Sequence, residues 1–277
     1  MSSSSIYSFP GLPFVLSYVK TALISILRTG PIPKHVAIVM DGNRRYARKH
    51  KQETREGHNA GFESLAQTLE LCYNAGVEVV TVFAFSIENF NRTKYEVDSL
   101  MEVAKSRLTQ ICDNGELAEQ YGIRISIVGD RSKLPADVLA VAQKVEKITR
   151  HNSKARLNVC FPYTSRDEMA TAIRNVVSDA KKGKIKSGDI TEDTIDEAMM
   201  FADCPPLDIL IRSSGVERFS DFMMWQAHQK TTVEFVSSLW PEFGFRQMYS
   251  ILLRWSLKRA CEQEDQEETQ EAIIKDE

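Results

Sequence analysis

The chain has 277 residues, of which 43% are hydrophobic and 26% are charged, the composition of a globular protein with one large domain. Its five cysteines are widely spaced and odd in number, which argues against a disulfide framework and favours a reducing compartment. The formal charge of −3 comes from residues 262–277, which hold eight acids and one lysine, so the rest of the chain is mildly basic. We expect residues 261–277 to form an acidic tail that is solvated or frayed.

Residues 1–33 form a distinct N-terminal segment with a serine run, prolines and an apolar stretch from Phe14 to Leu27. On a helix, its apolar side chains share one side, which is typical of an amphipathic helix at a membrane interface. The stretch is too short and too interrupted to span a bilayer, and no positive region precedes it as in a signal peptide. Interfacial membrane contact and packing on the chain's own domain both stay open. The apolar side consists of Val15, Val19, Ala22, Leu23 and Ile26.

Residues 34–260 alternate apolar β-type runs with helical patterns. This alternation predicts one α/β domain with a mainly parallel central sheet of about six strands flanked by helices. The runs lack an apolar–polar alternation, which predicts that both faces of the sheet are buried. The predicted strands are 35–40, 77–85, 123–129, 156–161, 207–211 and 231–236.

The helices between these strands are predicted from their ends. Apolar residues at helical spacing predict a helix over 62–73 that stops at Gly76. The polar stretch 181–205 is the one segment that looks like a linker. Capping-box or first-turn proline patterns predict three further helix starts, at Thr93 with Glu96, at Ser165 with Glu168, and at Pro135.

Three predicted strands end in unusual polar groups, at the edge where parallel α/β sheets bind ligands. Together they supply one strand-end carboxylate, a neighbouring glycine and five arginines, whose forks match phosphate oxygens. A structural ion-pair network would explain any one arginine, but three such strand ends together favour a phosphorylated ligand with a metal. The sets are Asp41 to Arg45, Ser86 to Asn89 with Arg92, and Arg212 to Gly215 with Arg218 and Ser220.

Other kinds of site lack their minimum parts. The sequence has no Walker A loop, no G-x-G-x-x-G, no H-E-x-x-H and no G-x-S-x-G, so it predicts neither a nucleotide-binding Rossmann fold nor a zinc protease or serine hydrolase. Of the five histidines, only His58 has a notable context, in REGHNAG ahead of a helix. Alone it would more often be a structural histidine.

At this point four segments, in order, resemble the cis-prenyltransferases of the undecaprenyl diphosphate synthase family: HVAIVMDGNRRYAR, GHNAGF, FAFSIENFNR and ILIRSSGVERFSDFMMWQ. The resemblance runs from about Gly30 to about Arg254. By GPIPKH, DGNRRYA and NVCFPYTSRDE, the chain is most similar to eukaryotic dehydrodolichyl diphosphate synthase catalytic subunits. This resemblance implies a Mg²⁺-dependent transferase that condenses isopentenyl diphosphate onto farnesyl diphosphate. The product would be a long polyprenyl diphosphate for dolichol synthesis and protein glycosylation.

The resemblance also implies roles for individual residues. Asp41 resembles the catalytic acid that holds Mg²⁺, and Asn43 the residue that assists condensation. The helix after Thr93 would supply one wall of a hydrocarbon tunnel that faces sheet residues such as Ala84 and Phe85, although any core helix shows such an apolar stripe. The stripe consists of Val97, Leu100, Met101, Ala104 and Leu108. The implied allylic diphosphate site is Gly42, Arg44, Arg45, Arg92, His58, Ser86 and Asn89, and the implied isopentenyl diphosphate site is Arg45, Arg212, Arg218 and Ser220.

The chain departs from the family pattern at three places. The common Gly-Glu-x-Arg has its acid displaced, at Glu217, and only Arg55 represents a basic residue usual before the GH segment. Bacterial members carry a second acidic metal ligand, whose nearest counterpart is Glu234, slightly out of register. We therefore do not assign Glu234 to the metal.

Single-subunit members of the family end in an Arg-x-Gly segment, which this sequence does not show. The resemblance thus implies a heteromer with a partner subunit that carries Arg-x-Gly, at the cytosolic face of the endoplasmic reticulum or in the cytoplasm, with no nucleic-acid partner. The alternative, a non-catalytic subunit of the same fold, would lack the strand-end acid and arginines. The partner is expected near 222–245, over Met223, Met224, Trp225, Phe235, Leu239 and Trp240.

Overall fold

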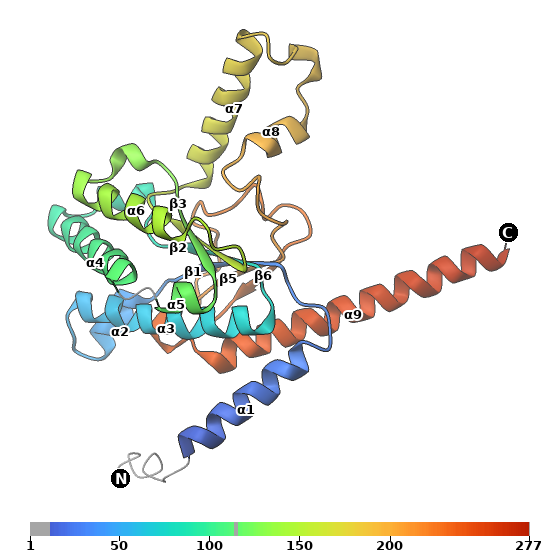
Figure 1. Ribbon diagram of the computed structural model, residues 1–277, viewed down its shortest axis with the longest axis horizontal. Coiled ribbons are helices and arrows are strands. Elements are labelled where there is room, and N and C mark those ends of the chain that lie inside the picture. The colour runs from blue at the N-terminus through green and yellow to red at the C-terminus, as the bar shows by residue number, and fades with distance from the viewer. Residues whose placement is uncertain (1–11, 114–115, 277) are drawn as a thin grey trace.

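The computed structural model describes residues 12–113 and 116–276. Its centre is one six-stranded sheet in the order β3-β4-β2-β1-β5-β6, with every neighbouring pair parallel (Figure 1). All six predicted strands and the predicted fold class are confirmed. The strands β1 to β6 are His35–Val39, Val79–Phe83, Ile123–Val128, Ala155–Cys160, Ile209–Arg212 and Thr232–Phe235.

Burial follows the position of each strand in the sheet. The inner strands β1, β2 and β5 are buried along almost their whole length, as the continuous apolar runs predict. The prediction of two buried faces is wrong for β3 and β6, which alternate or expose their side chains. Both are edge strands, and the chain covers an edge strand less completely than an inner one.

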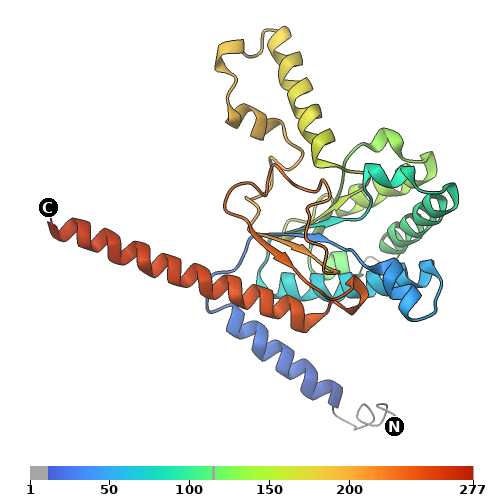
Figure 2. The same cartoon turned by 180° about the vertical axis from the view of Figure 1, so that it is seen from behind.

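Helices pack mainly on one face of the sheet. A large core lies between the sheet and α3, α4, α6 and α9, whereas a smaller core on the opposite face is filled from loops by Phe201, Phe222 and Met223. Figures 1 and 2 show α7 rising from the body and the far half of α9 extending away from it. The helices α1 to α9 are Leu12–Leu27, Asn43–Lys49, Thr54–Ala75, Lys94–Asp113, Glu116–Gln120, Ala136–Thr149, Ser165–Lys181, Glu192–Ala198 and Phe245–Asp276.

Most predicted helix ends are confirmed. α3 stops at Gly76, whose φ of +108° lies in the left-handed region that glycine adopts readily. Thr93 Oγ1 accepts the Glu96 N–H at the start of α4, and Pro135 directly precedes α6. The predicted linker 181–205 instead contains α8.

The capping box predicted at Ser165 is wrong. Ser165 is the first residue of α7, and its Oγ accepts the Met224 N–H at 3.0 Å instead of closing a local cap. Glu168 is buried and accepts hydrogen bonds from Tyr163 Oη, Met200 N and Gln226 Nε2. Partners distant in sequence therefore take both side chains away from the helix terminus.

The two terminal segments are helical over the described residues. α1 buries Leu27 in the main core but leaves Val15, Val19 and Ile26 exposed. α9 continues to Asp276, so the expected acidic tail is helical rather than frayed over the described residues, and residues 263–266 are exposed, as expected of a solvated tail. Over the described residues, no helix is long and apolar enough to cross a membrane. The serine run, Pro10 and Glu277 lie outside the described residues.

A buried hydrogen-bond network joins β1, β2 and β4 on the face that the loops cover. Asn158 Nδ2 donates to Thr81 Oγ1 at 3.1 Å, which leaves the threonine hydroxyl to donate to His35 Nε2, 2.8 Å away. His35 Nδ1 then donates to the Pro205 carbonyl at 3.0 Å. This arrangement uses a neutral imidazole, and burial lowers the pKa of His35 to about 4.

The first prediction follows from this low pKa. Between pH 6.5 and about 4 the unfolded chain binds a proton at His35 that the folded chain does not, so stability falls as the pH falls through this window, by about 3 kcal/mol in total. His35→Asn should lower the free energy of unfolding at pH 7. It should also flatten its slope against pH, measured by urea unfolding, by about one proton between pH 6 and 5. An unchanged slope would contradict the prediction.

Candidate active site

Because β1, β2 and β5 are adjacent and parallel, their carboxyl ends meet at one edge of the sheet. A cavity of about 1040 Å³ lies there. All twelve predicted site residues line it, so the structure brings together what the sequence scatters over almost 180 positions, while their individual roles stay predictions. They are Asp41, Gly42, Asn43, Arg44, Arg45, His58, Ser86, Asn89, Arg92, Arg212, Arg218 and Ser220.

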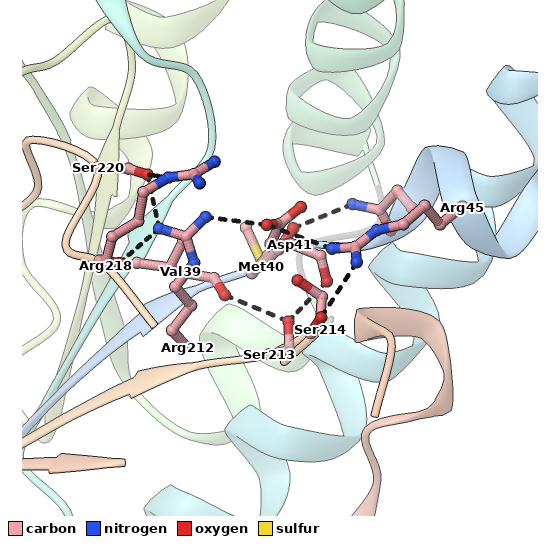
Figure 3. Close-up of polar contacts among 10 residues, drawn as sticks. Val39, Met40, Asp41, Arg45, Arg212, Ser213, Ser214, Arg218 and Ser220 are labelled. Carbon is pink, nitrogen blue, oxygen red and sulfur yellow. Dashed lines mark hydrogen bonds and ion pairs between the residues drawn. The ribbon is translucent and has the colours of Figure 1, made fainter. Parts of the chain in front are cut away.

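The centre of the site is an ion pair between the first and fifth strands (Figure 3). Arg212 Nη2 lies 3.0 Å from Asp41 Oδ2, and Arg45 Nη2 lies 3.6 Å from the same oxygen. Burial by itself raises the pKa of Asp41, but the Arg212 hydrogen bond and the nearby cations outweigh it and lower the pKa below the ordinary value. Asp41 is therefore an ionised carboxylate at neutral pH.

Arg212 is 3% exposed, and both of its Nη atoms donate hydrogen bonds to other residues of the chain. Besides Asp41, its guanidinium donates to the Arg218 carbonyl and, at 2.6 Å, to Ser220 Oγ. Arg218 Nε donates to the same hydroxyl at 3.2 Å, and the rest of the Arg218 side chain is exposed (Figure 3). This geometry makes Arg218 the accessible cation and Arg212 the group that organises it, a division of labour that the sequence did not show.

The turn after β1 depends on close approaches of glycine. Gly42 has φ +114° and is packed against Leu239, so the chain can turn directly from Asp41 into α2. A Cβ on Gly61 of α3 would lie 2.3 Å from Asn43 Oδ1. Sequence analysis did not single out Gly61, although GHNAGF contains it. The need for glycine at this helix position becomes clear only when the neighbouring Asn43 and Trp240 side chains are seen.

Three buried polar atoms of cavity-lining residues have no protein partner among the described residues: Arg212 Nε, and the pair Asn43 Oδ1 and His58 Nε2. Burial, with Arg92 and Arg44 nearby, lowers the pKa of His58 to about 4, so its imidazole is neutral. Buried polar atoms are normally hydrogen-bonded in folded proteins. This pair therefore indicates that a polar ligand completes the site.

Ser86 and Asn89 shape the loop after β2. Ser86 Oγ accepts the Glu88 N–H at 3.2 Å, and Asn89 Oδ1 accepts the Ser86 N–H at 3.1 Å. The two side chains thus hold the short 3₁₀ turn Ile87–Asn91 that carries the chain to Arg92.

The cavity wall has a strong excess of cations. Burial and the neighbouring Arg44 lower the pKa of Arg92, which shows how closely the guanidinium groups are crowded. Such a concentration of fixed positive charge attracts polyanions. Sequence analysis did not single out three of the arginines: Arg48 and Arg107 lie inside α2 and α4, and Arg166 comes shortly after the fourth predicted strand, at the same edge. The lining arginines are Arg44, Arg45, Arg48, Arg92, Arg107, Arg166, Arg212 and Arg218, against the acids Asp41, Glu88 and Asp221.

The same cavity has an apolar arm between α3, α4 and the sheet. Phe62 and Leu65 of α3 line it, together with residues of the predicted stripe of α4 and the expected Ala84 and Phe85. Of that stripe, Val97 and Met101 do not reach the cavity, and Met101 is buried in the core. The residues of the predicted stripe that do line the arm are Leu100, Ala104 and Leu108.

A metal would depend on Asp41. Within residues 12–113 and 116–276, no cluster of three or more His, Cys, Asp or Glu side chains could hold an ion. Glu234 lies in β6 and pairs with Arg254 at 2.9 Å, in agreement with leaving it unassigned. Mg²⁺ is often held by one or two carboxylates together with substrate phosphates. An ionised Asp41 beside unpartnered polar atoms and a concentration of arginines fits that mode.

Comparison with known proteins agrees with this geometry. The family model of undecaprenyl diphosphate synthases matches residues 39–261. A dehydrodolichyl diphosphate synthase complex subunit of Schizosaccharomyces pombe is 51% identical over 249 residues, which cover 90% of this chain and 94% of that protein. A human subunit of such a complex is 41% identical over 236 residues, covering 85% and 71%. Lavandulyl diphosphate synthase from Lavandula x intermedia, solved with dimethylallyl diphosphate, has a TM-score of 0.77 at 29% identity, covering 81% and 95%.

The second prediction tests the close contact between α3 and the turn. In Gly61→Ala the new Cβ meets Asn43 Oδ1 at 2.3 Å and Trp240 Cδ1 at 2.9 Å. This overpacking should outweigh the roughly 1 kcal/mol that alanine gains in a helix and lower the free energy of unfolding by about 1–3 kcal/mol. Gly188→Ala is the matched control, since nothing lies within 4 Å of its Cβ. Urea unfolding that shows equal stability for Gly61→Ala and the wild type would contradict the packing.

Proposed function

The chain belongs to the undecaprenyl diphosphate synthase family of cis-prenyltransferases, and we propose that it is the catalytic subunit of a dehydrodolichyl diphosphate synthase. It condenses isopentenyl diphosphate units onto farnesyl diphosphate. One observation carries this proposal: a single cavity joins a cationic mouth around Asp41 to an apolar arm between α3 and α4. That shape fits a ligand with a diphosphate head and a hydrocarbon tail.

We propose that the cationic mouth holds two diphosphates. We assign the allylic diphosphate to the side of Gly42, Arg44 and Arg92, and isopentenyl diphosphate to the side of Arg218 and Ser220. Arg45 lies between them, because its guanidinium contacts Asp41 on one side and the Ser214 carbonyl, at 3.1 Å, on the other.

The residues of the chain would supply electrostatic stabilisation and orientation. Fixed guanidinium groups stabilise the charge that grows on the departing diphosphate without having to reorganise. The neutral His58 has an unpartnered Nε2 at the cavity, and Asn43 lies in the turn beside Asp41, with its Oδ1 packed against Gly61. Leu100, Ala104 and Leu108 would receive the growing hydrocarbon. The reaction then needs no nucleophilic side chain.

We further assign Mg²⁺ to Asp41, shared with diphosphate oxygens. When bound, the ion would act as a Lewis acid on the leaving diphosphate. The Arg212 and Arg45 contacts keep the carboxylate ionised and oriented for this role.

The alternative is a non-catalytic partner subunit of the same fold. Such a subunit has no use for an ionised strand-end acid fixed by a buried arginine, and this chain has both. A phosphatase would need a nucleophile or a denser acidic metal cluster, and the described part of the chain contains no such cluster.

The third prediction tests the catalytic assignment. Asp41→Ala should lower polyprenyl synthesis from farnesyl diphosphate, labelled isopentenyl diphosphate and Mg²⁺ by at least about 100-fold. Asp41 is partly exposed and its removal opens no core cavity, but it leaves the buried Arg212 without its opposite charge, so the variant should fold with a free energy of unfolding lowered by about 3–5 kcal/mol, which urea unfolding checks. Glu234→Gln is the matched control and should keep most of the activity. Retention of wild-type turnover by Asp41→Ala would place the site elsewhere.

The relatives named above are subunits of synthase complexes, and this supports our proposal that the chain works with a partner subunit that carries Arg-x-Gly. The predicted contact surface over 222–245 needs correction, because Met223 and Trp240 are buried in the two cores. Met224 and Phe235 are exposed, at 42% and 39%. Phe235 lies in β6, an edge strand of the sheet, where sheets commonly accept partners, whereas Met224 lies beside the start of α7, where its N–H binds Ser165.

We also propose that the protein sits on the cytosolic face of the endoplasmic reticulum membrane as a peripheral protein. The support is α1, whose apolar side chains Val15, Leu16, Val19 and Ile26 point away from the domain core. An exposed apolar helix of this kind inserts shallowly into a membrane interface.

The fourth prediction concerns the heteromer. The purified chain alone should be weakly active, and addition of a partner subunit ending in Arg-x-Gly should raise turnover at least about tenfold. The double variant Met224→Asp with Phe235→Asp should lose co-purification with that partner, because charges would be buried at the contact. Ile148→Asp changes an equally exposed apolar residue on α6 and should still co-purify. Full activity of the chain alone would contradict the proposal.

A further inference from the structure

The loop after β5 has an unusual backbone. Ser220, Asp221 and Met223 have φ values of +52°, +61° and +46°, in the left-handed region that residues with side chains seldom adopt. Each such residue costs on the order of 1–3 kcal/mol and persists only where its surroundings hold it. The loop that carries the accessible Arg218 therefore needs an external support.

Asp221 provides that support by binding the first turn of α7. Its carboxylate is 12% exposed and accepts the Arg166 backbone N–H at 2.9 Å and Arg166 Nε at 2.8 Å. Its backbone carbonyl accepts the Ser165 N–H at 2.7 Å. Asp221 thus satisfies two of the N–H groups that a helix start leaves free, where the helix dipole also favours a negative charge.

The start of α7 is itself firmly held. Ser165 Oγ accepts the Met224 N–H, on the far side of the left-handed segment. One turn later, the buried Glu168 carboxylate binds Tyr163, Met200 and Gln226. The helix terminus can therefore act as a fixed anchor for the loop.

On its other side Asp221 adjoins Ser220, whose hydroxyl accepts hydrogen bonds from both Arg212 and Arg218 (Figure 3). A shift of Asp221 would move this shared acceptor and with it the Arg218 guanidinium. The second contact of Arg166, to Glu88 at 3.4 Å, is solvent-exposed and adds little.

We propose that Asp221 is a positioning residue for the diphosphate grip: bound to the first turn of α7, it holds Ser220, and through Ser220 it holds Arg218 in place for isopentenyl diphosphate. This inference rests on the proposed function. It adds a residue that does not itself bind either diphosphate. Being acidic, Asp221 would repel a diphosphate if it were not paired with Arg166.

Asp221→Ala removes both acceptor oxygens. We expect the KM for isopentenyl diphosphate to rise about tenfold or more, since charged hydrogen bonds are lost, while the KM for farnesyl diphosphate stays within about twofold. Asp221→Asn keeps an oxygen for the Arg166 N–H and should fall between wild type and Asp221→Ala. Asp179→Ala is the matched control, because it breaks an acid–lysine pair with Lys184 near the other end of α7 and should change neither KM.

Binding of isopentenyl diphosphate alone, measured by titration calorimetry on the full chain, separates this inference from the proposed function. Weakened binding in Asp221→Ala supports the inference even if the wild type makes no polyprenyl product, an outcome that would sink the proposed function. Wild-type affinity in Asp221→Ala overturns the inference, as does an equal rise in both KM values. If Asp221→Ala does not fold, wild-type affinity in Asp221→Asn overturns it.

Discussion

The ion pair between Asp41 and Arg212 is the contact on which the rest of the site depends. A guanidinium that is almost fully buried is tolerated only with an opposite charge and further hydrogen bonds, and Asp41, Ser220 and the Arg218 carbonyl supply them. β1 and β5 are adjacent and parallel, so the pair follows directly from the strand order. One interaction thus fixes the ionised acid on the first strand and the loop that follows the fifth.

The cavity has a cationic mouth and an apolar arm, and the two are built from different parts of the fold. The strands carry almost no charge along their length, and charged side chains follow their carboxyl ends, so charge gathers at one edge of the sheet while α3 and α4 enclose an apolar space beside it. Crowded arginines repel one another, and Arg44 adds to burial, the larger cause, in lowering the pKa of Arg92. An incoming diphosphate relieves that repulsion, and this adds to the affinity for polyanions beyond what any single contact gives.

Much of the fold and of the residues around the cavity could be predicted, because the inner strands are mainly apolar runs and most of the polar groups lie in the segments that follow β1, β2 and β5. What could not be predicted depends on partners distant in sequence. Ser165 and Glu168 match a local capping pattern, yet Ser165 binds Met224, 59 positions away. Met223 and Trp240 look like surface anchors in the sequence but fill cores whose other walls the sequence does not reveal. The hydrogen bonds of Arg212 could not be predicted either, because one of its partners, Asp41, is distant in sequence.

The loop after β5 shows how packing and binding are joined. Phe222 is buried between left-handed neighbours and stacks on Phe83 with ring centroids 4.6 Å apart, and Met223 is buried in the same core. Burying two such side chains contributes about 1.5–3 kcal/mol each, which is comparable with the strain of three left-handed residues at about 1–3 kcal/mol each. Burial alone therefore leaves the loop near balance. The hydrogen bonds to α7 then decide its conformation, so the small core and the helix terminus together determine where Arg218 points.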